Sequence, residues 1–344
     1  MQAAGDAFPP VVRLRPGLTS VPVPLPNSSL GHVFVYVFET DRGVYLVDAG
    51  WNTDEAYGVL DAGLATAGCA MGDVLGVLVT HVHPDHYGLA GRIREASGAW
   101  ISLHPADADL LTRRGIEPVD LRARMGSLMR QLGAPADEVA AMEAMVAMFT
   151  PGADVTLPDV LIEDGERPDV PGWDLSAIWT PGHTPGHLCF WEPRHRLLLT
   201  GDHVLPRITP NVSVNSQIDG DPLGEYLRSL DRLDEYRPDE VLPAHEYRFD
   251  DLHGRLAELR RHHDERFREA LVAIRHGHTT AWDIASRLSW SRGWDEIEGF
   301  MRRAAVGEAL AHLRALEGRG VVVETPGEPA HWSLTDAAAA HVAG

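Results

Sequence analysis

The stretch Thr80-His81-Val82-His83-Pro84-Asp85-His86-Tyr87-Gly88-Leu89-Ala90-Gly91 directly follows the apolar run Val74–Val79. It places three histidines and one carboxylate within six residues, at the point where a buried strand is expected to end. Imidazole and carboxylate groups are the usual protein ligands of zinc and similar divalent ions. A histidine-rich surface turn is the simpler alternative, but His-x-His-x-Asp-His behind a buried strand favours a metal site.

Three later segments each carry a further candidate ligand at the end of an expected strand. His183 lies in the turn 180–187, which reads Thr-Pro-Gly-His-Thr-Pro-Gly-His. Asp202 follows an expected strand at 196–200, and His245 ends a short strand that begins at Glu240. The sequence therefore predicts one metal site built from seven side chains: His81, His83, Asp85, His86, His183, Asp202 and His245.

Strands and helices alternate along the first 250 residues, which predicts an α/β domain. Ligands at strand ends are common in such layered folds. Thr53 is a suitable N-cap for the first helix. The strands are expected at 11–23, 32–39, 43–48, 74–80, 100–103, 155–161, 175–179, 187–191, 196–200 and 240–246, and the helices at 53–67, 86–97 and 223–236.

Two regions depart from this alternation. Residues 105–150 predict a helical insertion of two or three helices, whose methionines recur at helical spacing. Methionines in this pattern indicate a packed core. The alternative is that they line the binding site of an acyl substrate and form a wall over it. Residues 251–344 predict a separate domain of three helices followed by a two-stranded hairpin, an order that resembles a winged helix. The catalytic domain is accordingly expected at 1–250.

The composition and net charge of the chain limit the kinds of molecule that it is expected to bind and the compartment in which it is expected to occur. The chain has 344 residues and a formal net charge of −20, which disfavours binding to nucleic acid or to an anionic membrane. All 30 basic residues are arginine, as expected of a GC-rich, bacterial genome. Two cysteines, no signal peptide at the start and no apolar run of membrane-spanning length together predict a cytoplasmic protein.

The ordered ligand pattern resembles the metallo-β-lactamase superfamily, and most closely its glyoxalase II and β-lactamase-like-2 branches. The resemblance covers about residues 10–250, and the C-terminal region is similar to the winged helix of the second branch. It implies a four-layer αβ/βα sandwich with two metal ions at one edge. True β-lactamases resemble this chain less, because their zinc sites lack a bridging carboxylate in the position of Asp202.

The resemblance also implies how the two ions are held. Zinc is expected, with iron and manganese as alternatives. Asp202 would bridge the ions, and Asp48 would orient a ligand imidazole or else cap a turn. His187 and His203 flank the site, and their roles stay open. The remaining ligands fall into two sets, His81, His83 and His183 for one ion and Asp85, His86 and His245 for the other.

A dinuclear site predicts a hydrolase in which a metal-bridging hydroxide attacks an acyl carbon or a phosphorus atom. Asp85 is the expected catalytic residue, because it would both bind an ion and hold that hydroxide. A small-molecule thioester or ester is the favoured substrate, as for a hydroxyacylglutathione hydrolase. Cleavage of single-stranded RNA is the main alternative. A lactonase, a metal-bearing regulator that binds nucleic acid, and a homodimeric assembly are also kept open.

Overall fold

The computed structural model describes residues 8–26, 28, 30–116, 121–148, 156–215, 218 and 220–338. The chain divides into two compact units, and each is made of segments that are separated in sequence. Unit 1 comprises Met1–Arg113, Val155–Pro210 and Asp234–Arg255. Unit 2 comprises Arg114–Asp154, Asn211–Leu233 and Leu256–Gly344.

The larger sheet of unit 1 has seven strands in their order along the chain. The first four pair antiparallel, and β4 to β7 pair parallel. The strands are β1 (Val12–Arg15), β2 (Leu18–Pro24), β3 (His32–Glu39), β4 (Val44–Val47), β5 (Val74–Leu78), β6 (Trp100–Leu103) and β7 (Val160–Leu161). The last is shorter than predicted, and Val155 of the predicted strand lies outside the described residues.

The smaller sheet of unit 1 has four strands in the order β11-β10-β9-β8. The strands expected at 187–191 and 196–200 form a hairpin, since β9 and β10 pair antiparallel, whereas β10 and β11 pair parallel. Because β8 is antiparallel to β9, the chain leaves β8, β10 and β11 at the same edge. The strands are β8 (Ser176–Trp179), β9 (Leu188–Glu192), β10 (Leu197–Gly201) and β11 (Glu240–Pro243).

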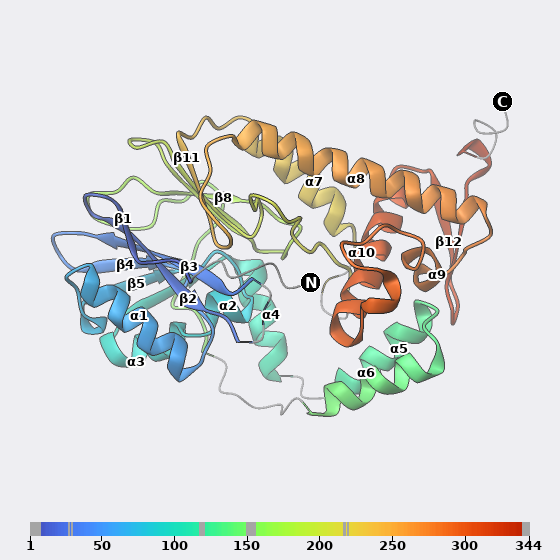
Figure 1. Ribbon diagram of the computed structural model, residues 1–344, viewed down its shortest axis with the longest axis horizontal. Helices are drawn as coiled ribbons and strands as arrows, with labels where there is room; N and C mark the ends of the chain where they lie inside the picture. Colours follow the sequence, from blue (N-terminus) through green and yellow to red (C-terminus); the bar gives the residue numbers. More distant parts are fainter. Residues whose placement is uncertain are drawn as a thin grey trace. The chain divides into compact units, whose positions relative to one another are not determined.

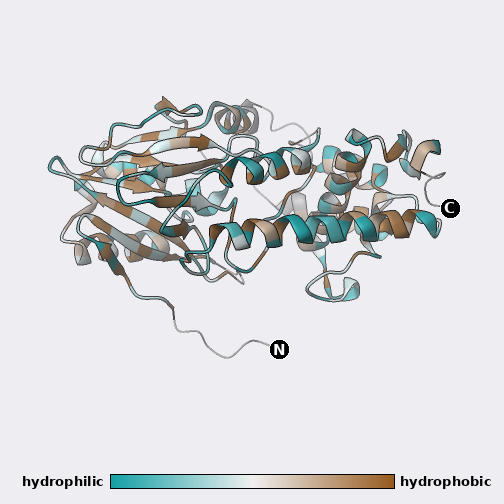
Figure 2. Cartoon of the chain, turned by 90° about the horizontal axis from the view of Figure 1, so that it is seen from above, coloured by the Kyte–Doolittle hydropathy of each residue, from teal (hydrophilic) through white to brown (hydrophobic). Residues whose placement is uncertain are grey.

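Both faces of the larger sheet are buried, as the alternation along β3 shows. Phe34, Tyr36 and Phe38 point toward the smaller sheet and pack with its apolar side chains. Val35 and Val37 point the other way, toward α1 (Asp54–Thr66) and α3 (Ala90–Ser97). Figure 1 shows these two helices along one side of the sheet, and in Figure 2 the strands are largely hydrophobic. The predicted α/β sandwich is confirmed.

The helix predicted as one piece over 86–97 is instead two helices, α2 (Pro84–Tyr87) and α3. The break has a clear cause in backbone hydrogen bonding. The Leu89 N–H donates to the Gly50 carbonyl at 2.9 Å, and the His86 carbonyl accepts from the Ala49 N–H at 2.8 Å. Because these groups pair with the loop after β4, they are unavailable to a continuous helix. The break therefore fixes α2 against the end of β4.

Unit 2 consists of helices and one two-stranded sheet, in which β12 and β13 pair antiparallel. The predicted order of three helices and a hairpin after residue 250 is observed, while its relation to a winged helix stays a prediction. Two helices, α4 and α8, begin in unit 1. The elements are α4 (Pro105–Ile116), α5 (Leu121–Gln131), α6 (Ala136–Met148), α7 (Pro222–Leu233), α8 (Leu252–Arg275), α9 (Ala281–Ala285), α10 (Gly299–Gly318), β12 (Val322–Thr325) and β13 (His331–Leu334), with short 3₁₀ turns at Met71–Asp73 and Trp294–Glu296.

The burial of side chains on these helices decides between the packed core and the substrate wall that the methionines left open. Met125, Met129 and Met142 are buried, which favours the packed core over a substrate wall for these three. Phe149 of the same pattern lies outside the described residues. His263 is buried as well, and its Nδ1 lies 3.1 Å from His312 Nε2. Among the described helices, none combines the length and the apolar character of a membrane span.

Candidate metal centre

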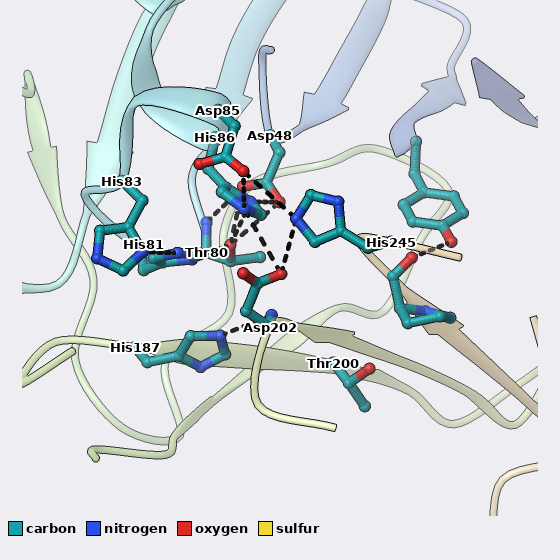
Figure 3. Close-up of polar contacts among 12 residues, drawn as sticks. Asp48, Thr80, His81, His83, Asp85, His86, His187, Thr200, Asp202 and His245 are labelled. Carbon is teal, nitrogen blue, oxygen red and sulfur yellow. Dashed lines mark hydrogen bonds and ion pairs between the residues drawn. The ribbon is translucent and has the colours of Figure 1, made fainter. Parts of the chain in front are cut away.

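Four strand ends of the two sheets deliver the candidate ligands to one place, and a fifth brings Asp48 beside them. In the larger sheet, Asp48 follows β4, and the turn 80–87 follows β5. In the smaller sheet, the ligands follow β8, β10 and β11, which end at a common edge. Figure 3 shows the side chains from both sheets converging. Parallel strand ends thus bring together residues that are as far apart in sequence as His81 and His245.

Backbone hydrogen bonds join these strand ends across the two sheets. The Leu188 N–H donates to the Thr80 carbonyl at 2.8 Å, and the Phe34 N–H donates to the Ala244 carbonyl at 2.7 Å. Within the smaller sheet, the Ala244 N–H donates to the Gly201 carbonyl at 3.0 Å. Hydrogen bonds between and within the two sheets therefore hold the backbone on which the candidate ligands lie.

The first set of ligands is His81, His83 and His183. The distance from His81 Nε2 to His83 Nδ1 is 2.9 Å, and His183 Nε2 lies 3.2 Å and 2.9 Å from the same two atoms. His81 and His183 are buried, whereas His83 is half-buried. Three ring nitrogens thus face one point.

The second set is Asp85, His86 and His245. Asp85 Oδ2 lies 3.6 Å from His86 Nε2 and 3.4 Å from His245 Nε2. Both imidazoles are fully buried, and Asp85 is the more exposed member. His83 and Asp85 are thus the ligands nearest to solvent in their sets.

Asp202 lies between the two sets and contacts both. Its Oδ1 is 3.5 Å from His86 Nε2 and 3.2 Å from His245 Nε2, while its Oδ2 is 3.6 Å from His183 Nε2. One carboxylate with an oxygen toward each set has the geometry that a bridging ligand requires. All seven predicted site residues are thus brought together.

Hydrogen bonds at the far side of the rings show that this site fits divalent cations. His245 Nδ1 lies 2.8 Å from the His32 carbonyl oxygen, which can only accept, so Nδ1 carries the proton. His86 Nδ1 likewise faces an Asp48 oxygen at 2.8 Å. The Nε2 atoms of both rings are buried and have no hydrogen-bond partner among the described residues. Buried lone pairs that converge without a donor are what a metal ion satisfies.

The pKa shifts of the site histidines also fit a metal centre. Burial and the neighbouring His183 imidazole lower the pKa of His83 to about 3, and burial also lowers the pKa of His81. These rings therefore stay neutral, as ligands must. Burial disfavours a charged His245, but the Asp202 carboxylate outweighs this and raises the pKa of His245 to about 10. The second set thus stabilises positive charge, which a divalent ion would supply in place of protons.

Asp48 acts behind His86, as the orienting role predicted. Its Oδ1 accepts from the Thr80 N–H at 2.8 Å, and its Oδ2 pairs with His86 Nδ1. The Thr80 hydroxyl donates to the Asp48 carboxylate at 3.0 Å and lies 3.0 Å from His81 Nδ1. Asp48 has a φ of +64°, in the left-handed region that is costly for a residue with a side chain. Strain of this kind is typical of functional sites.

Asp107 was not predicted from the sequence, yet it contacts the turns that carry the first set. It lies in the first turn of α4 and is fully buried. Its carboxylate accepts hydrogen bonds from the Val82 N–H, the Thr184 hydroxyl and the Gly186 N–H. In the sequence it reads as an ordinary acidic residue at a helix start, so no local pattern marks it.

The flanking histidines are held within the protein. His187 is buried, its Nδ1 lies 2.8 Å from the Thr180 hydroxyl, and its Nε2 accepts from the Asp202 N–H at 3.2 Å. This neutral ring supports the backbone of Asp202 (Figure 3). His203 is buried against His187, with 5.5 Å between ring centroids. Full burial of both rings disfavours the contact with substrate that the sequence left open.

Comparison with known proteins places this site in a family context. A family model described as Metallo-beta-lactamase superfamily matches residues 29–245. Among proteins similar in sequence, the probable metallo-hydrolase YqjP of Bacillus subtilis (strain 168) is 28% identical over 271 residues, which are 72% of this chain and 80% of that protein. The matched family segment contains every candidate ligand.

Two solved structures resemble this chain over nearly its whole length. A metallo-beta-lactamase family protein from Thermus thermophilus is 32% identical, with a TM-score of 0.77, and the match covers 94% of this chain and 100% of that one. A beta-lactamase domain protein from Burkholderia ambifaria is 26% identical, with a TM-score of 0.75, over 96% of this chain and 97% of that one. The similarity thus extends through both units.

Proposed function

Because the chain belongs to the metallo-beta-lactamase superfamily and has its α/β fold, we propose that it is a hydrolase with two metal ions that cleaves a thioester or ester of a small molecule. The observation that carries this proposal is the position of Asp202. Its two oxygens face opposite sets of imidazole nitrogens, which supports two ions sharing one carboxylate. His81, His83 and His183 would hold one ion, and Asp85, His86 and His245 the other.

The residues of the chain then have separate tasks. When bound, divalent ions in such a site lower the pKa of a water molecule toward neutrality and polarise the oxygen of an acyl group. Burial opposes ionisation of Asp85, but the His86 and His245 imidazoles outweigh it and lower the pKa of this carboxyl to about 2. Asp85 is therefore ionised at neutral pH and accepts a hydrogen bond that orients the attacking water. We propose it as the catalytic residue.

The direction from which substrate arrives follows from exposure. His83 and Asp85 are the half-buried ligands, whereas the others are buried. An acyl group would therefore approach from the side of the turn 83–85. Zinc is the ion we propose, since imidazole and carboxylate ligands suit it, with iron and manganese to be compared.

Arginine contacts support the acyl substrate over the RNA alternative. Helix α8 carries six arginines that an RNA backbone could contact, and at least three of them have protein partners. Arg255 donates to the carbonyls of residues 205, 207 and 208, Arg260 pairs with Asp231, and Arg266 pairs with Glu269. With a net charge of −20, the chain offers little attraction for a polyanion.

The test is a turnover panel on the full-length protein loaded with zinc, iron or manganese. The substrates are a hydroxyacyl thioester, a simple ester, a lactone and a single-stranded RNA. We expect thioester or ester turnover, and we expect Asp85→Asn to lower kcat by at least about 100-fold. Asp61→Asn, at an exposed position of α1, is the matched control and should leave kcat unchanged.

Three outcomes would each overturn a part of this proposal. Robust RNA cleavage without turnover of the thioester or ester would replace the substrate class and leave the metal centre in place. Wild-type kcat in Asp85→Asn would remove the catalytic role of Asp85. Elemental analysis should find two ions per chain, and a single ion would contradict the dinuclear site.

A further inference from the structure

We infer that Asp107 is a positioning residue, which holds the two ligand-bearing turns of the first set in register so that their ring nitrogens converge. The inference rests on the metal centre of the proposed function but is independent of the substrate. Asp107 belongs to neither ligand set and lies at the start of α4, between the turns 80–87 and 180–187.

The contacts of Asp107 join two sheets through one side chain. Its Oδ2 accepts from the Val82 N–H at 2.9 Å and from the Thr184 hydroxyl at 2.8 Å. Its Oδ1 accepts from the Gly186 N–H at 2.7 Å. Val82 lies between two ligands of the first set, whereas the other donors follow His183. The turn after β5 and the turn after β8 are therefore tied to one carboxylate.

Only a carboxylate satisfies this arrangement. Three donors point at two oxygens, and a buried carboxylate is stable only where such donors compensate its charge. An asparagine has one accepting oxygen, so its NH₂ group would face either the Gly186 N–H or the Val82 N–H. One of the two turns would then lose its backbone hydrogen bond to the side chain at position 107. The predicted defect is a misplaced ring nitrogen rather than an unfolded chain.

Packing at Gly186 shows how closely the turn approaches Asp107. A Cβ atom at position 186 would lie 2.6 Å from the Asp107 nitrogen and 2.7 Å from its Cβ. The glycine therefore permits the short hydrogen bond from its own N–H. This close approach is the physical reason for a glycine three residues after His183.

The role of Asp107 differs from that of Asp48. Asp48 contacts His86, a ligand of the second set, whereas Asp107 contacts the turns around the first set. Loss of Asp107 should therefore weaken one ion selectively. A residue that merely stabilised the fold would weaken both ions or neither.

The experiment measures zinc affinity in two single-site backgrounds of the full chain. His245→Ala should retain the ion of the first set, and His81→Ala the ion of the second. In the His245→Ala background, we expect Asp107→Asn to raise the Kd for zinc about 10- to 100-fold. In the His81→Ala background, the same change should leave the Kd within about twofold.

Two further variants make the result interpretable. Asp109→Asn, exposed and two residues further along α4, is the matched control and should change neither Kd. Thr184→Val removes one bond and leaves the carboxylate in place, so it should weaken only the first ion, by less than Asp107→Asn. If Asp107→Asn fails to fold, the zinc affinities of Thr184→Val test the inference in its place.

The inference is overturned if Asp107→Asn leaves both affinities at the values of the parent variants, or weakens both equally. It is also overturned if Thr184→Val weakens the second ion as much as the first. A wild-type chain that binds no zinc, iron or manganese would instead overturn the proposed function, and the inference with it. Failure of the substrate assay alone would leave the inference standing.

Discussion

At the scale of single residues, the hydrogen-bond partner of Nδ1 decides whether Nε2 of the same histidine ring is available to bind a metal ion. In His81, His86 and His245, that partner is respectively a hydroxyl, a carboxylate and a backbone carbonyl. The carboxylate and the carbonyl can only accept, and the Thr80 hydroxyl already donates to Asp48, so each accepts from Nδ1 and leaves Nε2 directed inward. The site is therefore prepared for cations by partners that do not themselves bind them.

Replacing Asp48 with asparagine tests this arrangement. The amide can keep either the bond from the Thr80 N–H or the bond from His86, but its NH₂ group cannot accept the other. We expect a 10- to 100-fold loss of zinc affinity at the second set. Calorimetric titration would measure the loss, with Asp61→Asn as control. An unchanged affinity would show that His86 needs no such partner.

A second prediction concerns Glu308 of α10. Burial raises the pKa of its carboxyl to about 7, against the lowering effect of Arg266. The folded chain therefore holds this proton up to about pH 7, whereas the unfolded chain loses it from its ordinary pKa of 4.5. The stability that the neutral group contributes is complete below pH 4.5 and is lost as the pH rises through 7.

Glu308→Gln removes this dependence. Between pH 5 and 8 the variant should gain roughly 1–2 kcal/mol relative to wild type, after allowance for partial exposure of the carboxylate. Urea unfolding at both pH values measures the difference, and other groups cancel in the comparison. An equal difference at the two pH values would contradict the raised pKa.

At this scale, the sequence marks candidate ligands where the pattern is local. His81 to His86 form one short motif, and His183 sits in a repeated Thr-Pro-Gly-His, so both stand out in the sequence. The His32 carbonyl and Asp107 do not, because a backbone oxygen has no sequence signature and a buried aspartate has the same letter as an exposed one. Their tasks arise only from tertiary contact.

At the scale of elements, α1 shows how a helix is seated on the larger sheet. A Cβ at Gly63 would lie 2.3 Å from Val21 Cγ1 of β2, whereas a Cβ at Gly58 would meet nothing within 4 Å. The two glycines of one helix therefore have different reasons to be there. Gly63 allows the close approach of helix and strand, and Gly58 sits on the exposed side.

The matched pair of alanine variants tests this seating. Gly58→Ala should stabilise unit 1 by about 1 kcal/mol through helix propensity alone. Gly63→Ala gains the same propensity but overpacks the interface, so we expect a net loss of about 1–2 kcal/mol. Chemical denaturation measures both. If Gly63→Ala were as stabilising as Gly58→Ala, the contact with Val21 would not limit the packing.

Element boundaries were predicted well where capping is local. Thr53 was expected to cap α1, and its side chain accepts from the Ala56 N–H as a cap should. The division of α2 from α3 was missed, because it depends on hydrogen bonds to Gly50 and Ala49 in a different part of the chain. Helical periodicity shows which face of a helix is apolar. It does not show which backbone groups of the helix form hydrogen bonds with another loop.

At the scale of the whole molecule, all seven candidate ligands lie in unit 1. Metal removal should therefore act unequally on the chain. We expect a chelator to lower hydrogen-exchange protection at the ends of β5, β8, β10 and β11, and to leave the hairpin β12–β13 nearly unchanged. Mass spectrometry of peptides measures both regions in one experiment.

The same chelation should lower the thermal stability of the loaded protein. An ion present at 100 times its Kd contributes about 2.7 kcal/mol, and added zinc should restore it. A variant with His81→Ala and His245→Ala is the control and should show no response. Equal loss of protection in both units would contradict a metal centre confined to unit 1.

The segmental make-up of the units was beyond prediction from sequence. Read along the chain, residues 105–150 form an insertion and residues 251–344 a separate domain. In the structure, Arg114–Asp154 and Leu256–Gly344 belong to one compact unit, together with Asn211–Leu233. An apolar helix face such as that of Met125 and Met129 predicts burial, but it does not identify the segment of the chain against which the helix packs.

The wide spacing of the ligands has a consequence for how the protein is made. His81 is synthesised 164 residues before His245, an interval of roughly 10–30 s on a translating ribosome. During that time the nascent chain carries His81, His83 and His86 without Asp202 and without β11, which precedes His245. An ion captured early would meet only part of the proposed coordination and would exchange readily. The ions of the proposed centre would thus be selected only after residue 245 has joined the site.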